Sequence, residues 1–489
     1  MKRKLDQFFH ISERKSTVRT EIIAGCTTFL AMAYILTVNP NNVLWNGTSD
    51  PRFAAVFIAT AIGSFIGTML MALLAKSPLA QSSAMGLNAI AGSIIGGAMG
   101  FAYSYGNTMA LILISGIAFL LLSILPGGRN KEGKKVTLRE RIFIAMPDCV
   151  KKAITVGIGL FIAFIGMQNA GLIVDNQFTL VDLVSFNDTS VWAVGGIGRS
   201  AVVALFGLIV IAILSHYKVR GSVILGIGAA TILSIPLKVA NLSILAGSEA
   251  GISWKFWENI NSYINCKDVF FGIFRGGFDF PVGSLFTSIM LVITLAMLDM
   301  FDTMGTVVGC CKGANLLDKD GVPVNYDKMM MSDSIATCTG ALFGTSTIST
   351  FVESGAGVAE GGKTGLTALT TAVLFLLSIF LLPLFAFIPT AAAAGALMYV
   401  GVLMMKNVTD LDFENPKYAV PSFVTIIITV LAYSITKGIG LGLISFFVID
   451  VIVYIIDLIR GKEAKLETTF VTFAIVVLYL IYFLVPTML

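Results

Sequence analysis

The sequence predicts an all-α polytopic membrane protein built from two repeats of opposite orientation. Three observations support this fold class: an apolar composition, recurring runs of membrane-spanning length, and similarity between the two halves of the chain. Hydrophobic residues make up 56% of the 489 residues and charged residues only 13%, with a mean hydropathy of +0.87. Since a soluble globular protein carries roughly a quarter charged residues, the chain lacks much of the charge that a solvated surface requires.

Spanning a bilayer takes about 20 apolar residues, and runs of about this length recur along the whole chain. They are predicted at 21–40, 53–75, 79–104, 106–126, 149–172, 200–217, 221–240, 282–310, 332–346, 347–362, 366–388, 389–406, 419–435, 437–459 and 468–488. Residues 1–20 are polar and basic, which is unlike a cleavable signal peptide.

Basic residues set the orientation of such a chain, because lysine and arginine are enriched in cytoplasmic loops. Six of them lie within residues 1–20, so the N-terminus is predicted to be cytoplasmic. Counting crossings from there places the basic cluster 129–141 on the same side and the loops 173–199 and 241–281 outside. The net charge of +4 therefore reflects topology, and no nucleic-acid partner is expected.

Neither a metal centre nor a cofactor is expected. The six cysteines show no C-x-x-C spacing, and His10 and His216 are the only histidines. Gly357–Thr364 match G-x-x-x-x-G-K-[ST], but a phosphate-binding loop needs a soluble α/β domain around it. This match runs between two apolar segments, so it is interpreted as accidental. Asp302-Thr303 followed by Gly305 resembles an aspartic-protease motif, but Met304 interrupts it, and the sequence predicts no enzyme.

Three pairs of segments, one from each half, resemble each other in the same order. Seven predicted spans separate the copies, so the second copy is inverted in the membrane, as in secondary transporters with interrupted helices. The alternative is chance similarity among glycine- and alanine-rich helices, which the preserved order disfavours. The pairs are 83–89 with 354–360, 146–161 with 388–404, and 216–228 with 433–445. The segment 468–488 has no such partner and is predicted to be an added helix.

The pair 83–89 and 354–360 is too polar and glycine-rich for a lipid-facing helix, and a β-prone stretch, 347–352, precedes the second. Each is interpreted as an extended segment leading into a half-helix that starts near mid-membrane. The first N–H groups of a helix have no acceptor within it, and they carry the positive end of the dipole. Each start is therefore a candidate site for hydrogen-bond acceptors.

Carboxylates inside a bilayer are costly and hence functional candidates. Asp299 and Asp302 lie one helical turn apart, and Glu353 lies where the second half-helix begins. Asn88 is at the matching place in the first half. The alternative is that these acids only hold the bundle together through polar neighbours, and for Asp450 both interpretations stay open.

The same motifs resemble the nucleobase:cation symporter-2 family, most closely its AzgA-like branch of adenine, guanine and hypoxanthine permeases. The resemblance covers nearly the whole chain up to about 459, and the stretch 344–369 is its most specific part. Its other motifs are AGCTTFLAMAYILTVNP (24–40), SSAMGLNA (82–89), MFDTMGT (300–306), LLDKDG (316–321) and ALMYVGVLMM (396–405). One departure is Ser82-Ser83, where the family often has Ala-Pro.

The resemblance implies seven plus seven inverted spans, with a core domain that holds substrate against a gate domain. The segments would be a cytoplasmic N-terminus (1–20), the core domain first half (21–126, spans 1–4), the gate domain first half (149–240, spans 5–7), an extracellular loop (241–281), the core domain second half (282–388, spans 8–11), the gate domain second half (389–459, spans 12–14) and an extra C-terminal hydrophobic segment (468–488).

The resemblance also implies roles for the polar residues. Glu353 and Asp302 would be the main substrate-binding carboxylates, with Asp299 beside them. The remaining members of the expected site are Asn88 and Gly86 from the first half-helix, and, by position, Phe351, Val352 and Ala31. The carboxylates Asp299, Asp302 and Glu353 are also the candidates for coupling to protons.

The hydrogen-bonding groups of a purine suit this set of expected binding residues. A purine edge alternates N–H donors with acceptors, a carboxylate can accept two parallel N–H bonds, and Phe351 could stack on the ring. The expected function is import of adenine, guanine or hypoxanthine across the cytoplasmic membrane, by proton symport with an elevator-type movement. The alternatives are an anion exchanger of the same fold, which the lack of a buried basic residue near the site disfavours, or a uracil or xanthine permease. Because family members are often dimers, a homodimer is a further expectation.

Overall fold

A computed structural model of the chain describes residues 2–44, 50–97, 101–129, 135–138, 146–219, 221–244, 252–313, 316, 323–432, 435–461 and 465–484. Most of the basic cluster 129–141 and of the LLDKDG motif lies outside these residues, as do parts of the predicted segments 241–281 and 468–488. The fold is almost entirely helical, with three two-stranded sheets in the described part.

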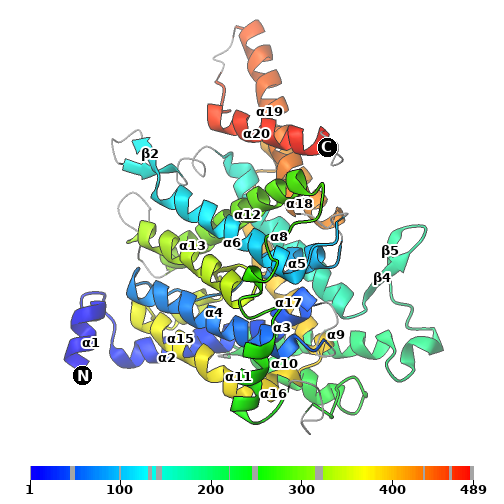
Figure 1. The fold of residues 1–489 in the computed structure, drawn as a ribbon. Coiled ribbons are helices and arrows are strands. Elements are labelled where there is room, and N and C mark those ends of the chain that lie inside the picture. Colours follow the sequence, from blue (N-terminus) through cyan, green and yellow to red (C-terminus); the bar gives the residue numbers. More distant parts are fainter. Residues whose placement is uncertain are drawn as a thin grey trace.

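Most helices, which are labelled in Figure 1, fall within the predicted apolar runs. In the first half they are α1 (Lys2–Phe9), α2 (Val18–Met32), α3 (Ile35–Leu44), α4 (Phe53–Leu73), α5 (Met85–Ile95), α6 (Tyr105–Ile124), α8 (Asp148–Asn169), α9 (Ile197–His216) and α10 (Ser222–Ser234). In the second half they are α11 (Phe256–Asn265), α12 (Leu285–Gly313), α13 (Tyr326–Phe343), α14 (Ser354–Ala359), α15 (Gly365–Leu377), α16 (Leu382–Ala386), α17 (Thr390–Met405), α18 (Pro416–Leu431), α19 (Ile435–Ile459) and α20 (Phe470–Leu484).

Among the described residues, nine helical segments are long and apolar enough to cross a membrane, and four shorter apolar helices accompany them. The protein is therefore a multi-pass membrane protein, as its composition predicts. The predicted runs 79–104 and 347–362 are not continuous spans. Each contains a short strand followed by a short helix, α5 or α14, which confirms the two interrupted half-helices.

The helices pack in two groups. In the first helix group, α4 packs against α13 and α15, α6 against α12 and α13, and α2 against α14 and α15. In the second helix group, α8 packs against α17 and α18, α9 against α10 and α17, and α18 against α19. Far fewer contacts join the groups, for example those of α12 and α5 with α8.

Two strands from the two halves of the chain pair at the centre of the first helix group. β1 (Gln81–Ser83) runs antiparallel to β6 (Ile348–Thr350), with Gln81 opposite Thr350 and Ser83 opposite Ile348. All six residues are buried. Because the strands are antiparallel, the half-helices that follow them begin at opposite ends of the pair. This arrangement is the local consequence of the inverted repeat.

Polar side chains hold this strand pair, which we call the crossover, inside the apolar bundle. Asn39 of α3 accepts hydrogen bonds from Ser83 (2.6 Å) and Ser346 (3.0 Å), and it donates to Thr60 (2.8 Å) and Thr345 (2.9 Å). In lipid, polar groups must find partners within the protein. Ser83 thus stands where the family often has proline, and it is engaged by hydrogen bonding.

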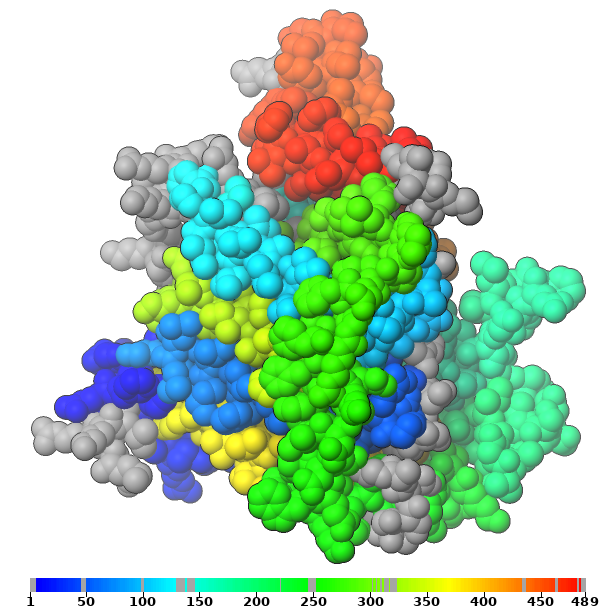
Figure 2. All heavy atoms as spheres, in the orientation of Figure 1, coloured from blue at the N-terminus to red at the C-terminus, as the bar shows by residue number. Residues whose placement is uncertain are grey.

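Two features lie outside the predicted spans. The segment 252–281 carries the amphipathic helix α11, which packs against α4, and it lies in the green band that crosses the surface in Figure 2. A hairpin of β4 (Ile173–Asn176) and β5 (Leu180–Leu183) projects from the side of the molecule (Figure 1). The sequence predicts neither the helix nor the hairpin, because short amphipathic and alternating patterns are weak signals beside long apolar runs.

Asp450, whose role the sequence leaves open, ties α19 to the linker that leads into α20. Its carboxylate accepts hydrogen bonds from the Thr468 amide (2.8 Å) and hydroxyl (2.6 Å), and it pairs with Lys417 of α18 (2.8 Å). These contacts satisfy a buried charge and support the structural interpretation of this residue.

Candidate functional site

A cavity of about 840 Å³ lies between the two helix groups. The first group contributes α2, the crossover, the starts of both half-helices, and α12. The second group contributes α8, the α9–α10 link and α17. Six of the eight residues expected to bind substrate line this cavity: Ala31, Gly86, Asp302, Phe351, Val352 and Glu353.

The structure does not place the other two expected residues on the cavity. Asn88 is two residues beyond Gly86 on α5, a rotation of about 200°, and its side-chain oxygen accepts a hydrogen bond from Asn42 (3.2 Å). Asp299 is 1% exposed and accepts a hydrogen bond from the Thr337 hydroxyl of α13 (2.8 Å). Asp299 thus lies one helical turn from Asp302, but its carboxylate bonds Thr337 of α13, whereas that of Asp302 lies near Ser349 of β6.

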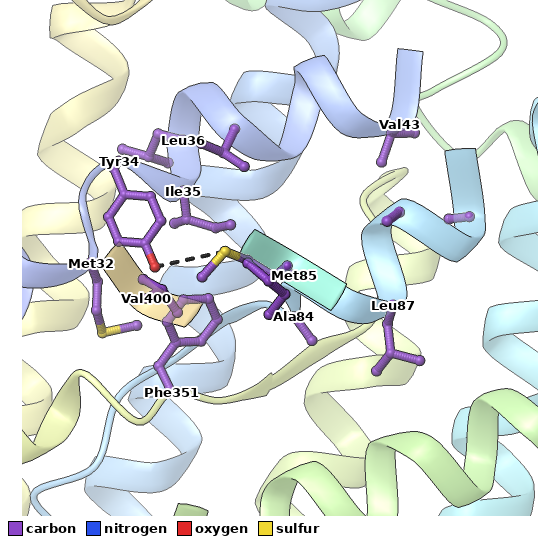
Figure 3. Packing of buried hydrophobic residues seen from close by; sticks show 14 of the residues in the cluster. Met32, Tyr34, Ile35, Leu36, Val43, Ala84, Met85, Leu87, Phe351 and Val400 are labelled. Atoms are coloured by element: carbon purple, nitrogen blue, oxygen red, sulfur yellow. Dashed lines mark hydrogen bonds between the residues drawn. The ribbon is translucent and has the colours of Figure 1, made fainter. Parts of the chain in front are cut away.

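Glu353 sits at the residue before α14, facing the cavity from a mostly buried position, 8% exposed. Its Oε1 accepts a hydrogen bond of 2.6 Å from the hydroxyl of Tyr34. Tyr34 lies at the break between α2 and α3, and its hydroxyl also approaches the Met85 sulfur at 3.8 Å (Figure 3). Tyr34 was missed from the sequence, because a single tyrosine in an apolar run looks like a packing residue.

Asp302 lies beside a second network around Asp333 of α13. Asp333 is fully buried, and it accepts hydrogen bonds from Gln81 (2.9 Å) and Thr350 (3.0 Å) of the crossover and from Thr303 (2.7 Å). The Asp302 carboxylate is 3.4 Å from the Ser349 hydroxyl. Asp333 was also missed, because it falls at the start of a predicted run, where an acid is usually solvated.

The apparent phosphate-binding loop holds a carboxylate of the chain itself. Glu21 of α2 is 0% exposed and accepts hydrogen bonds from the amides of Lys363 and Thr364 (both 3.1 Å). It also accepts from the hydroxyls of Thr364 (2.8 Å) and Thr367 (2.6 Å). Three donors of the matching stretch, which are the amides of Lys363 and Thr364 and the Thr364 hydroxyl, are thus occupied by Glu21.

This Glu21 contact joins α2 to the segment that follows α14. Gly357 of α14 lies so close to α2 that a Cβ there would come within 2.6 Å of the Ala24 carbonyl oxygen. Arg14 adds hydrogen bonds to the carbonyls of Lys363 (2.7 Å) and Lys76 (2.9 Å). The helix that starts at the cavity carboxylate is therefore anchored at its far end to α2.

We expect Glu21→Gln to destabilise the fold. Glutamine replaces one acceptor oxygen by an NH₂ donor, which would face the amide and hydroxyl donors that now surround Glu21. Leaving buried donors unsatisfied costs about 1–3 kcal/mol. Thermal unfolding of the purified variant in detergent should show a lower midpoint than wild type. Glu13→Gln is the control, since the side chain of Glu13 is 76% exposed; equal midpoints for all three proteins would contradict the prediction.

Comparison with known proteins extends these observations. The family model described as "Permease family" matches residues 19–441. The guanine/hypoxanthine permease PbuO of Bacillus subtilis (strain 168) is 34% identical over 469 residues, which cover 96% of this chain and 98% of PbuO. The adenine permease AdeP of Escherichia coli (strain K12) is 34% identical over 447 residues, which cover 91% of this chain and 90% of AdeP.

Among solved structures, the transmembrane domain of a cyanobacterium bicarbonate transporter, BicA, superposes with a TM-score of 0.57 at 15% sequence identity. The match covers 87% of this chain and 97% of that domain. At this level of identity the likeness concerns the fold alone.

Proposed function

The chain belongs to the permease family, in its nucleobase:cation symporter-2 group, and from this membership we propose that it imports purine nucleobases across the cytoplasmic membrane by proton symport. It is a transporter and not an enzyme. The observation that carries the purine proposal is that Glu353 and Asp302 line one cavity together with Phe351.

The chemistry of this cavity suits a flat, neutral heterocycle. Carboxylate oxygens accept the N–H groups of a purine edge, and the Phe351 ring offers an apolar face to the base. The names of the relatives, which are adenine and guanine/hypoxanthine permeases, support the same substrate class. Uracil and xanthine are the alternatives within the family.

An anion exchanger is the second candidate, because BicA shares the fold. Among the described residues that line the cavity, the basic ones are Lys218 and Lys406, just beyond the ends of α9 and α17 in the second helix group. The carboxylates lie on the first group. An anion held at the crossover would therefore meet like charges, which disfavours this candidate.

We assign the transport movement to the two helix groups. The segments 21–126 and 282–388 would form the core domain, and 149–240 and 389–459 the gate domain, with the cavity between them. A charged carboxylate is costly to move past apolar surface. A purine and a proton bound together would neutralise the site and lower the cost of sliding the core, with Asp302, Asp299 and Glu353 as candidate proton carriers.

Gradient-driven uptake into proteoliposomes tests this proposal. Vesicles that are alkaline inside and contain no nucleotide should accumulate radiolabelled hypoxanthine, because the inward proton gradient drives symport. A protonophore should abolish the accumulation and leave counterflow exchange intact. Competition by each nucleobase and by sulfate then ranks the substrates. Uptake that requires ATP, or that ignores imposed H⁺ and Na⁺ gradients, would contradict the proposal.

A further inference from the structure

One of the two oxygens of the cavity carboxylate already has a donor from the protein. The Tyr34 hydroxyl lies 2.6 Å from Oε1 of Glu353 and 3.8 Å from the Met85 sulfur. Its single hydrogen can serve one acceptor, and a carboxylate is a far stronger acceptor than a thioether. One acceptor position of Oε1 is therefore taken by Tyr34, and a ligand that bonds Oε1 must share this oxygen with the tyrosine hydroxyl.

Tyr34 is held firmly in this position. It is 1% exposed, and Figure 3 shows its ring among Met32, Leu36 and Phe351. Its carbonyl accepts hydrogen bonds from the amides of Thr37 and Val38 (both 3.0 Å) at the start of α3. Because both its backbone and its ring are packed in place, the phenolic oxygen stays beside Oε1 when a ligand arrives.

The hydrogen bond from Tyr34 to Glu353 affects which purine edge the carboxylate can bind best. Hypoxanthine, guanine and xanthine differ only at carbon 2, which carries hydrogen, an amino group or a carbonyl. Hypoxanthine presents one N–H at this edge, guanine presents two parallel donors, and xanthine adds an acceptor beside its N–H. A free carboxylate would favour guanine, because it can accept two parallel hydrogen bonds.

We propose that Tyr34 is a specificity-determining residue, because its hydroxyl competes with the 2-amino group of guanine for Oε1 of Glu353 and so reduces a preference for guanine over hypoxanthine. Tyr34 does this from behind the cavity, since it is not among the residues that line it. The inference rests on the proposed binding of purines at Glu353. Within that class, it concerns the affinity for guanine relative to that for hypoxanthine.

The test is the guanine-to-hypoxanthine affinity ratio of Tyr34→Phe, measured with purified protein by competition against radiolabelled hypoxanthine. Phenylalanine keeps the ring and removes the hydroxyl, so the 2-amino group of guanine no longer competes with it for Oε1. We expect the ratio to rise about tenfold over wild type, the size of one charge-assisted hydrogen bond. A ratio within twofold of wild type, in a variant that still binds hypoxanthine as wild type does, would overturn the proposal. Global damage would weaken both ligands alike and leave their ratio unchanged.

Tyr105→Phe is the matched control. The Tyr105 hydroxyl donates to the Gly344 carbonyl at 2.8 Å, and the side chain is buried but away from the large cavity. Its removal should leave the ratio unchanged. An equal rise in this variant would show that the effect does not pass through Glu353, and would also overturn the proposal.

Wild-type protein alone provides a second test, which holds even if Tyr34→Phe fails to fold. Guanine and hypoxanthine should bind within about threefold of each other, and a guanine preference above about tenfold would overturn the inference. If wild type binds neither base, the proposed function fails. If both bind and the ratio does not respond to Tyr34→Phe, only this inference fails.

Discussion

Glu353→Gln is expected to weaken purine binding by about 5- to 150-fold. The amide oxygen can still accept the hydroxyl of Tyr34, which now bonds Oε1. The new NH₂ group would then face the N–H donor of the purine, in a mostly buried position. An unpaired buried donor costs about 1–3 kcal/mol, and each 1.4 kcal/mol corresponds to a tenfold change in affinity.

Equilibrium binding of hypoxanthine and guanine to the purified variant measures this effect. Glu258→Gln is a suitable control, because it makes the same change of charge at an exposed residue of α11, which pairs with Lys255 and does not line the cavity. Binding by the Glu353 variant that equals wild type would show that this carboxylate does not hold the substrate.

Asp302→Asn is expected to abolish concentrative uptake while leaving exchange of purine across the membrane. Asp302 lines the cavity near Glu353 and the buried Asp333 network. Several carboxylates in a low-dielectric region do not all ionise easily, which suits one of them to carrying a proton. Asparagine keeps the size and the polarity of the side chain but has no proton to release, so the gradient would no longer drive accumulation.

Proteoliposomes that carry the variant separate the two activities, since counterflow reports exchange and an imposed pH gradient reports accumulation. Asp299→Asn is the informative comparison, because Asp299 lies one turn away but bonds Thr337 and does not line the cavity. Loss of accumulation in the Asp299 variant alone would assign the proton to Asp299. Normal accumulation by both variants would exclude both aspartates.

Much of the fold follows from local patterns in the sequence. Long apolar runs determine where helices cross, and the polar, glycine-rich stretches at 83–89 and 354–360 mark the half-helices, because such composition does not suit lipid. Glu353 and Asp302 stand out for a similar reason, since a carboxylate within an apolar run is costly without a partner. All of these features are visible in single stretches of sequence, without the contacts between distant segments.

The remaining parts of the site depend on contacts between distant segments. Tyr34 meets Glu353 across 319 residues of chain, and Glu21 meets Thr367 across 346. No local pattern encodes such pairs. Spacing alone also placed Asp299 beside Asp302, whereas the position of α13 directs Asp299 to Thr337. The direction of a side chain is thus decided by its neighbours in space.

The crossover has a consequence for how the protein is made. β1 ends at Ser83, and its partner β6 begins at Ile348, so the ribosome must add a further 265 residues before the first strand can pair. At 5–20 residues per second, this takes roughly 10–50 seconds. During that time the strand partner of residues 82–83 is missing, whereas the backbone of Gln81 can already bond the Thr68 hydroxyl, and unpaired backbone groups are not tolerated in lipid. The first half of the nascent chain must therefore wait, sheltered from lipid by water or by the insertion machinery, until the second half emerges to complete it.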